Sequence, residues 1–108
     1  MSGPALIVYC TCPDEATGAS IAQALVERRL AACVSVAGPL RSIYRWQSAV
    51  ESAREFLLII KTTTNRYGEL ERAILALHPY ELPEVLAVPV SDGLPAYLRW
   101  VEECTNDS

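Results

Sequence analysis

The chain is short of the residues that several kinds of functional site require. Its 108 residues include one histidine, one methionine and one phenylalanine, and 9 basic side chains stand against 13 acidic ones. A single histidine excludes a histidine-rich metal site within one chain. The net charge of −4, the pI near 4.9 and the lack of a basic run argue against nucleic-acid binding, which needs clustered Lys and Arg to displace counterions.

Long apolar segments, targeting signals and catalytic motifs are also missing. No apolar run approaches the roughly 20 residues of a transmembrane helix, and the stretch from Ala5 to Tyr9 is too short for the apolar part of a secretory signal. There is no Gly-rich phosphate loop, no Gly-x-Ser-x-Gly elbow and no His-Glu-x-x-His motif. We therefore expect a cytoplasmic protein with four free thiols that is not an enzyme and binds neither membranes nor nucleic acid.

The length of the chain and its content of hydrophobic residues are sufficient for one compact domain. Hydrophobic residues make up 51% of the chain and charged residues 20%. A chain of this size can bury about two thirds of its surface on folding. We expect a single domain over residues 1–108, with its core between about residues 5 and 103.

Four apolar segments rich in β-branched residues predict β-strands. They span residues 5–12, 32–46, 50–62 and 85–90. Pro13 stops the first strand, and Gly38-Pro39 predicts a bend in the second. Pro89 favours an edge position for the last strand, because a proline has no N–H for the ladder.

Three segments show helical spacing of their apolar residues. The first begins after Asp14, a predicted N-cap, and is expected to hold Arg28 and Arg29 in its last turn. The second follows residues 62–65, which offer several caps, and ends at His78-Pro79. A short terminal helix covers residues 95–103.

The order β-α-β-β-α-β followed by a helix predicts an α+β, ferredoxin-like sandwich with both long helices on one face of the sheet. Its second and third strands are longer than such a domain needs and form a hairpin that carries Tyr44 and Trp46. A long hairpin with aromatic residues favours edge pairing between copies of the chain. We therefore expect a homo-oligomer, with Tyr44 and Trp46 at the contact between subunits.

Thiols and the histidine are the candidate metal ligands. Cys10 and Cys12 share one face of a strand and Cys33 opens the next strand, and thiolates suit Cu(I) and Zn. The alternative is that Cys10 and Cys33 are small buried hydrophobic residues. His78 either bonds the last carbonyls of its helix or serves as a ligand or acid/base group.

A second candidate site is polar. Lys61 ends an apolar strand, where its ammonium either reaches solvent or faces a cleft between subunits. In such a cleft, Lys61 would bind a small anionic ligand together with Tyr80, Glu81 and Glu84 on the proline-bounded loop. Otherwise this loop is a rigid connector.

Several ordered motifs across residues 5–103 resemble the CutA family of divalent-cation tolerance proteins. They are Cys12-Pro13-Asp14-Glu15-Ala16, Leu30-Ala31-Ala32-Cys33-Val34, Ser42-Ile43-Tyr44-Arg45-Trp46, Ile60-Lys61-Thr62, His78-Pro79-Tyr80-Glu81-Leu82-Pro83-Glu84 and Tyr97-Leu98-Arg99-Trp100. The resemblance implies a ferredoxin-like fold, a tight homotrimer assembled like the trimeric PII signalling proteins, and a role in tolerance to copper and other divalent metals. It favours Cys10 and Cys33 as copper ligands and gives no role to Cys12 and Cys104. Ser48 departs from the family, which tends to have glycine there, and serine resists the positive φ that glycine permits.

The leading interpretation is a cytoplasmic homotrimer that binds copper or another divalent metal ion through Cys10, Cys33 and His78, with no obligatory cofactor. Two alternatives remain open at this point. One is a PII-like sensor of a small anionic ligand in clefts between subunits. The other is a non-catalytic trimeric scaffold.

Overall fold

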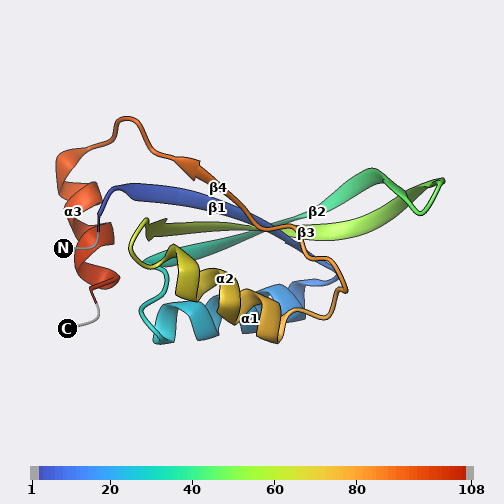
Figure 1. Ribbon diagram of the computed structural model, residues 1–108, viewed down its shortest axis with the longest axis horizontal. Helices are drawn as coiled ribbons and strands as arrows, with labels where there is room; N and C mark the ends of the chain where they lie inside the picture. The colour runs from blue at the N-terminus through green and yellow to red at the C-terminus, as the bar shows by residue number, and fades with distance from the viewer. Residues whose placement is uncertain (1–2, 107–108) are drawn as a thin grey trace.

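The computed structural model describes residues 3–106 and contains four strands and three helices (Figure 1). In chain order these are β1 (Ala5–Cys12), α1 (Glu15–Glu27), β2 (Cys33–Trp46), β3 (Ala49–Thr63), α2 (Tyr67–Leu77), β4 (Leu86–Pro89) and α3 (Pro95–Cys104). The predicted β-α-β-β-α-β order with a terminal helix is confirmed. No helix within these residues is both long enough and apolar enough to cross a bilayer.

The strands form one antiparallel sheet in the order β2-β3-β1-β4. β1 pairs with β3 over its whole length but with β4 only from Leu6 to Tyr9. β4, which contains Pro89, lies at an edge, as predicted. Helices α1 and α2 lie side by side on one face of the sheet, and α3 lies at one end of it (Figure 1). Within residues 3–106, no strand pairs with the outer side of residues 10–12 of β1.

The core lies between the sheet and the two long helices. Alternate residues of β1 are buried, because successive strand side chains point to opposite faces. The buried residues that meet there include Leu6, Val8, Cys10, Cys12, Ile21, Leu25, Leu58, Ile60, Leu70 and Ile74. Gly18 of α1 allows close packing, since a Cβ added to it would lie 3.2 Å from Cδ2 of Leu58.

Helix α1 begins where the sequence predicts but ends earlier. Asp14 accepts a hydrogen bond from the Thr17 N–H at 2.7 Å, so the predicted N-cap is confirmed. The prediction that Arg28 and Arg29 occupy the last turn of α1 is wrong, because Arg29 adopts a φ of 59° and closes the helix after Glu27. The backbone bonds Leu30 N–H to Leu25 O and Arg29 N–H to Val26 O complete this Schellman ending.

The N-cap of helix α2 is Arg66 and not one of residues 62–65, contrary to the prediction. β3 continues to Thr63, so the N-cap is Arg66, whose own side chain makes no capping bond. The Arg66 guanidinium instead donates to the backbone carbonyls of Arg28 and Arg29 beyond α1. Arg66 therefore ties the start of α2 to the end of α1.

The β2–β3 hairpin extends well beyond the helices (Figure 1), and the molecule measures 44 × 26 × 21 Å. The predicted bend is confirmed as a register shift between Ala37 and Leu40, around Gly38-Pro39. At the tip, Trp46 pairs with Ala49 across a two-residue turn. Both turn residues, Gln47 and Ser48, have positive φ, as a type I′ turn requires.

Candidate metal centre

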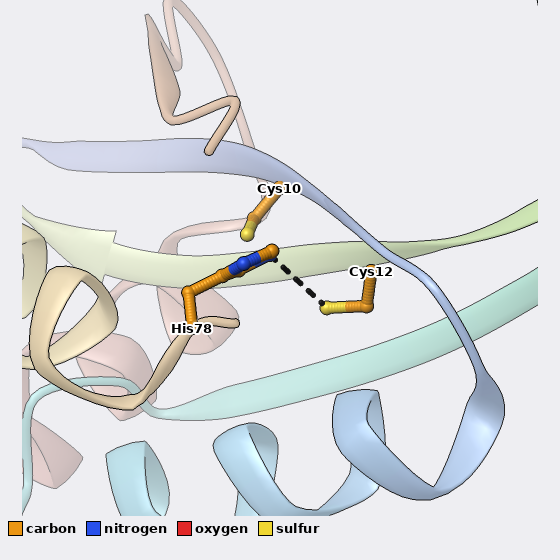
Figure 2. Close-up of side chains that lie close together, drawn as sticks. All are labelled: Cys10, Cys12 and His78. Carbon is orange, nitrogen blue, oxygen red and sulfur yellow. Dashed lines mark hydrogen bonds between the residues drawn. The ribbon is translucent and has the colours of Figure 1, made fainter. Parts of the chain in front are cut away.

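Three soft metal ligands meet beneath the outer edge of β1. The sulfurs of Cys10 and Cys12 and a ring nitrogen of His78 all lie within 4.8 Å of one another (Figure 2). The two cysteines are fully buried and His78 is 8% exposed. Both cysteines point toward the helices because they are two residues apart on a strand, while His78 follows the last residue of α2.

The His78 ring is held by hydrogen bonds at both nitrogens. Its Nδ1 accepts the Tyr80 N–H at 3.1 Å, and its Nε2 lies 2.7 Å from the Thr11 carbonyl oxygen. Because Nδ1 accepts, the neutral ring carries its proton on Nε2 and donates it to Thr11. The prediction that His78 bonds the carbonyls of its own helix is wrong. Its extended backbone, with ψ 137°, ends α2 and directs the ring toward β1, beyond the last residue that β4 pairs.

The two thiols are electrostatically unequal. Interaction with the neighbouring Cys12 thiol, together with burial, raises the pKa of Cys10, whose S–H also lies 3.8 Å from the Thr11 carbonyl oxygen. The same interaction lowers the pKa of Cys12. Sγ of Cys12 also lies 3.8 Å from Nε2 of His78.

The donor set fits a soft metal ion. Sulfur and imidazole nitrogen are the ligands that copper and zinc prefer in proteins. Two metal–sulfur bonds of about 2.3 Å span at most about 4.6 Å, so sulfurs within 4.8 Å of each other can close on one ion with a small movement. The imidazole could join only by giving up the Nε2 proton that it donates to Thr11.

Cys33 lies apart from this cluster. Val34 and Val36 pack against the core, so Cys33 points to the opposite face of the sheet, where its sulfur is 3.7 Å from the Tyr97 hydroxyl of α3. One ion cannot bind Cys33 and Cys10 of the same chain. Within one chain, the structure thus brings together Cys10, Cys12 and His78 rather than the predicted Cys10, Cys33 and His78. In the sequence, the Cys-x-Cys spacing places Cys12 on the same strand face as Cys10, and this spacing is the feature that points to Cys12 as a third member of the cluster.

An acidic cleft of about 670 Å³ lies between the hairpin and the loop after α2. Its lining residues are Thr11, Ser42, Ile43, Tyr44, Trp46, Glu51, Glu55, Tyr80, Glu81, Leu82 and Glu84. The Tyr80 hydroxyl donates to the buried Glu55 carboxylate at 2.7 Å, and burial together with this bond raises the pKa of Tyr80. The lining includes four carboxylates and no basic side chain, which favours a cation over an anion.

Lys61 is not part of this cleft. It pairs with Ile7 of β1 and Cys33 of β2, whereas the cleft includes Thr11, four residues further along β1. Within one chain, Lys61 therefore does not join Glu81 and Glu84. Their meeting across a subunit boundary stays a prediction, as does the contact of Tyr44 and Trp46 with another subunit.

The fold and the cluster define the class: a ferredoxin-like α+β protein with a buried set of soft metal ligands. The sequence pattern of the CutA1 divalent ion tolerance protein family matches residues 6–104. The chain belongs to this family, which confirms the resemblance found in its motifs.

Known relatives agree in sequence and in fold. The divalent-cation tolerance protein CutA of Thermus thermophilus is 48% identical over 99 residues, covering 92% of this chain and 96% of that protein. A solved structure of a divalent cation tolerance protein from Thermus thermophilus has a TM-score of 0.93, covering 94% of this chain and 99% of that one at 46% identity. The periplasmic divalent cation tolerance protein CutA from Archaeoglobus fulgidus has a TM-score of 0.91 at 33% identity, over 94% and 99% of the two chains. The predicted ferredoxin-like fold is confirmed.

Proposed function

We propose that this chain forms a cytoplasmic homotrimer that binds a metal ion of the copper class as part of divalent cation tolerance. The observation that carries the proposal is the buried cluster of Cys10, Cys12 and His78. The names of its relatives concern tolerance of divalent cations. The cluster supplies a donor set through which such a protein can act on a metal directly.

The acidic cleft supports a cationic ligand. Thr11 lines the cleft, and its carbonyl accepts the His78 hydrogen bond at the edge of the cluster. Carboxylates gathered in a cleft raise the local concentration of cations. Cations collected by Glu55, Glu81 and Glu84 therefore arrive beside the buried sulfurs.

The two sheet edges support assembly into a trimer. β2 and β4 are edge strands, and they carry exposed apolar side chains such as Ile43 at 68%, Leu86 at 60% and Val88 at 46%. Unpaired edges of this kind readily pair with another chain. Pairing of edge β2 of one copy with edge β4 of the next is a head-to-tail contact. Repeated contacts of this kind form a closed ring of subunits when the rotations between successive copies add up to one full turn.

The anion-sensor alternative is disfavoured by the charge of the cleft. Four carboxylates line it and Lys61 lies elsewhere on the sheet. A phosphate or carboxylate ligand would meet repulsion at this position. The scaffold alternative explains the projecting hairpin but gives no role to the buried thiol and imidazole cluster.

Equilibrium dialysis of the reduced protein against Cu(I), Cu(II) or Zn(II), followed by metal analysis, tests the metal-binding proposal. The wild type should retain copper, and Cys10→Ser should lose it. Cys33→Ser is the matched control and should retain copper, because Cys33 lies on the other face of the sheet. A wild type that retains none of these ions, or equal retention by wild type and Cys10→Ser, would contradict the proposal.

A further inference from the structure

We infer that Cys10 and Cys12 form a two-sulfur site for Cu(I), in which His78 positions Cys12 but is not itself a ligand. This inference rests on the proposed metal-binding function and names its ion, its ligands and the role of the histidine. The cluster geometry carries it. The same three side chains could otherwise form a Cys₂His site, and the contacts of His78 separate these two arrangements.

The two sulfurs are already placed so that both can bind one metal ion. Cys10 and Cys12 lie on one face of β1, and the rigid pairing of β1 with β3 extends through both residues, to Leu58 and Phe56. Their side chains point into the same buried space (Figure 2). An ion that replaces the thiol protons between them needs no rearrangement of the strand.

His78 is committed to other partners. Its Nδ1 accepts the Tyr80 N–H and its Nε2–H donates to the Thr11 carbonyl. To ligate through Nε2, the ring would have to lose its proton and leave the Thr11 carbonyl without this donor, at a strand edge that β4 does not cover. Nε2 also lies 3.8 Å from Cys12 Sγ, so its single N–H is shared between the Thr11 carbonyl and a metal-bound thiolate, which it stabilises as an outer partner.

The number of donors favours Cu(I) over zinc. Structural zinc is almost always bound by four ligands. Among residues 3–106, the ligand atoms that lie within 4.8 Å of one another here are those of Cys10, Cys12 and His78, and the last is engaged. Cu(I) is stable with two thiolate ligands, and soft sulfur selects it.

The cover over the site is the loop that leads from α2 to β4. Residues 10–12 of β1 have β3 on one side and no strand on the other, where His78 contacts Thr11 instead. The same loop carries Glu81 and Glu84 along the acidic cleft. An ion drawn into the cleft therefore reaches the sulfurs by displacing one loop rather than by opening the core. Binding releases the thiol protons to solvent, and copper remains Cu(I) throughout.

An anaerobic titration of Cu(I) against the chromophoric chelator bicinchoninate tests the ligand set. Cys12→Ser and Cys12→Ala should each weaken Cu(I) binding about 100-fold or more, beyond the range typical of an outer partner. Cys104→Ser is the matched control and should bind as the wild type does. Two Cys12 variants are used so that a folding defect of one does not decide the result.

Two variants of His78 separate a ligand from a positioning residue. His78→Ala should weaken Cu(I) binding about 10-fold to 100-fold, the usual cost of losing an outer partner. His78→Gln, which keeps an N–H donor, should recover most of this loss. X-ray absorption of the Cu(I)-loaded wild type should show two sulfur neighbours and no imidazole scattering.

The outcomes are distinguishable from failure of the proposed function. If Cys10→Ser loses copper but both Cys12 variants bind like the wild type, the two-sulfur site is wrong and the metal-binding function stands. Imidazole scattering, or a loss in His78→Gln as large as in Cys12→Ser, would overturn the positioning role. Zn(II) bound as tightly as Cu(I) would overturn the choice of ion. A wild type that binds none of these ions contradicts the proposed function itself.

Discussion

Replacement of Ser48 by glycine at the hairpin tip is expected to stabilise the protein. Gln47 has φ 49° and Ser48 has φ 75°, so both residues of the turn adopt left-handed backbone conformations. Serine is strained in this region because its Cβ approaches the backbone, whereas glycine is not. The type I′ turn that joins Trp46 to Ala49 therefore contains a residue that its geometry disfavours.

The magnitude follows from two opposing effects. Relief of the left-handed strain at Ser48 is worth about 1–2 kcal/mol. Glycine also makes the unfolded chain more flexible, which costs about 0.4–1 kcal/mol. The net gain in the free energy of unfolding therefore lies between zero and about 1.6 kcal/mol, with a central value of about 0.8 kcal/mol.

Urea unfolding at a fixed protomer concentration measures this gain, since the stability of an oligomer depends on concentration. With a slope of about 1–3 kcal/mol per molar urea, Ser48→Gly should move the midpoint upward by several tenths molar. Ser42→Gly is the matched control: Ser42 lies within β2, where glycine should destabilise by about 0.5–1 kcal/mol. A loss of stability in Ser48→Gly equal to that in the control would refute the reasoning.

Three further predictions concern the cleft, the core and a helix end. Tyr80→Phe removes the hydroxyl that donates to the buried Glu55 and should lower the free energy of unfolding in urea by about 1.5–3 kcal/mol; an unchanged midpoint would contradict this. Ile74→Ala empties a fully buried core position and should cost about 2–5 kcal/mol in the same assay, with a smaller loss indicating that the core collapses around the gap. The Thr17 N–H lowers the pKa of Asp14, so the stability from this cap is present above the ordinary Asp pKa and is lost as pH falls through the lowered value. The difference in thermal stability between wild type and Asp14→Ala should therefore shrink in acid, and a difference constant with pH would contradict the assignment.

The fold was predictable because local pattern and global arrangement agree. β1 alternates buried and half-buried residues and stops at Cys12, before Pro13, and the bend at Gly38-Pro39 appears in the hairpin as expected. The ends of the long helices were harder to predict. The end of α1 depends on the left-handed Arg29 and the start of α2 on Arg66, whose side chain bonds carbonyls beyond another helix. Such tertiary contacts leave no periodic signal in the sequence.

The candidate site was predictable in part. Two of the proposed ligands, Cys10 and His78, meet as expected although they lie far apart in the chain. Cys33 does not join them, because one step of strand alternation sends its side chain to the opposite face of the sheet. The engagement of both His78 nitrogens could not be predicted, since Thr11 and Tyr80 act through backbone atoms that any residue would supply.

Native mass spectrometry of the reduced protein, with and without Cu(I), tests the central claim most directly, because it measures assembly and bound metal together. The account predicts a trimer that gains one copper ion per chain, and a trimer of Cys10→Ser, Cys12→Ser that gains none. A monomer would contradict the assembly proposed from the two sheet edges. A wild-type trimer that stays free of copper, or a double variant that binds as much as the wild type, would contradict the role of the buried thiols.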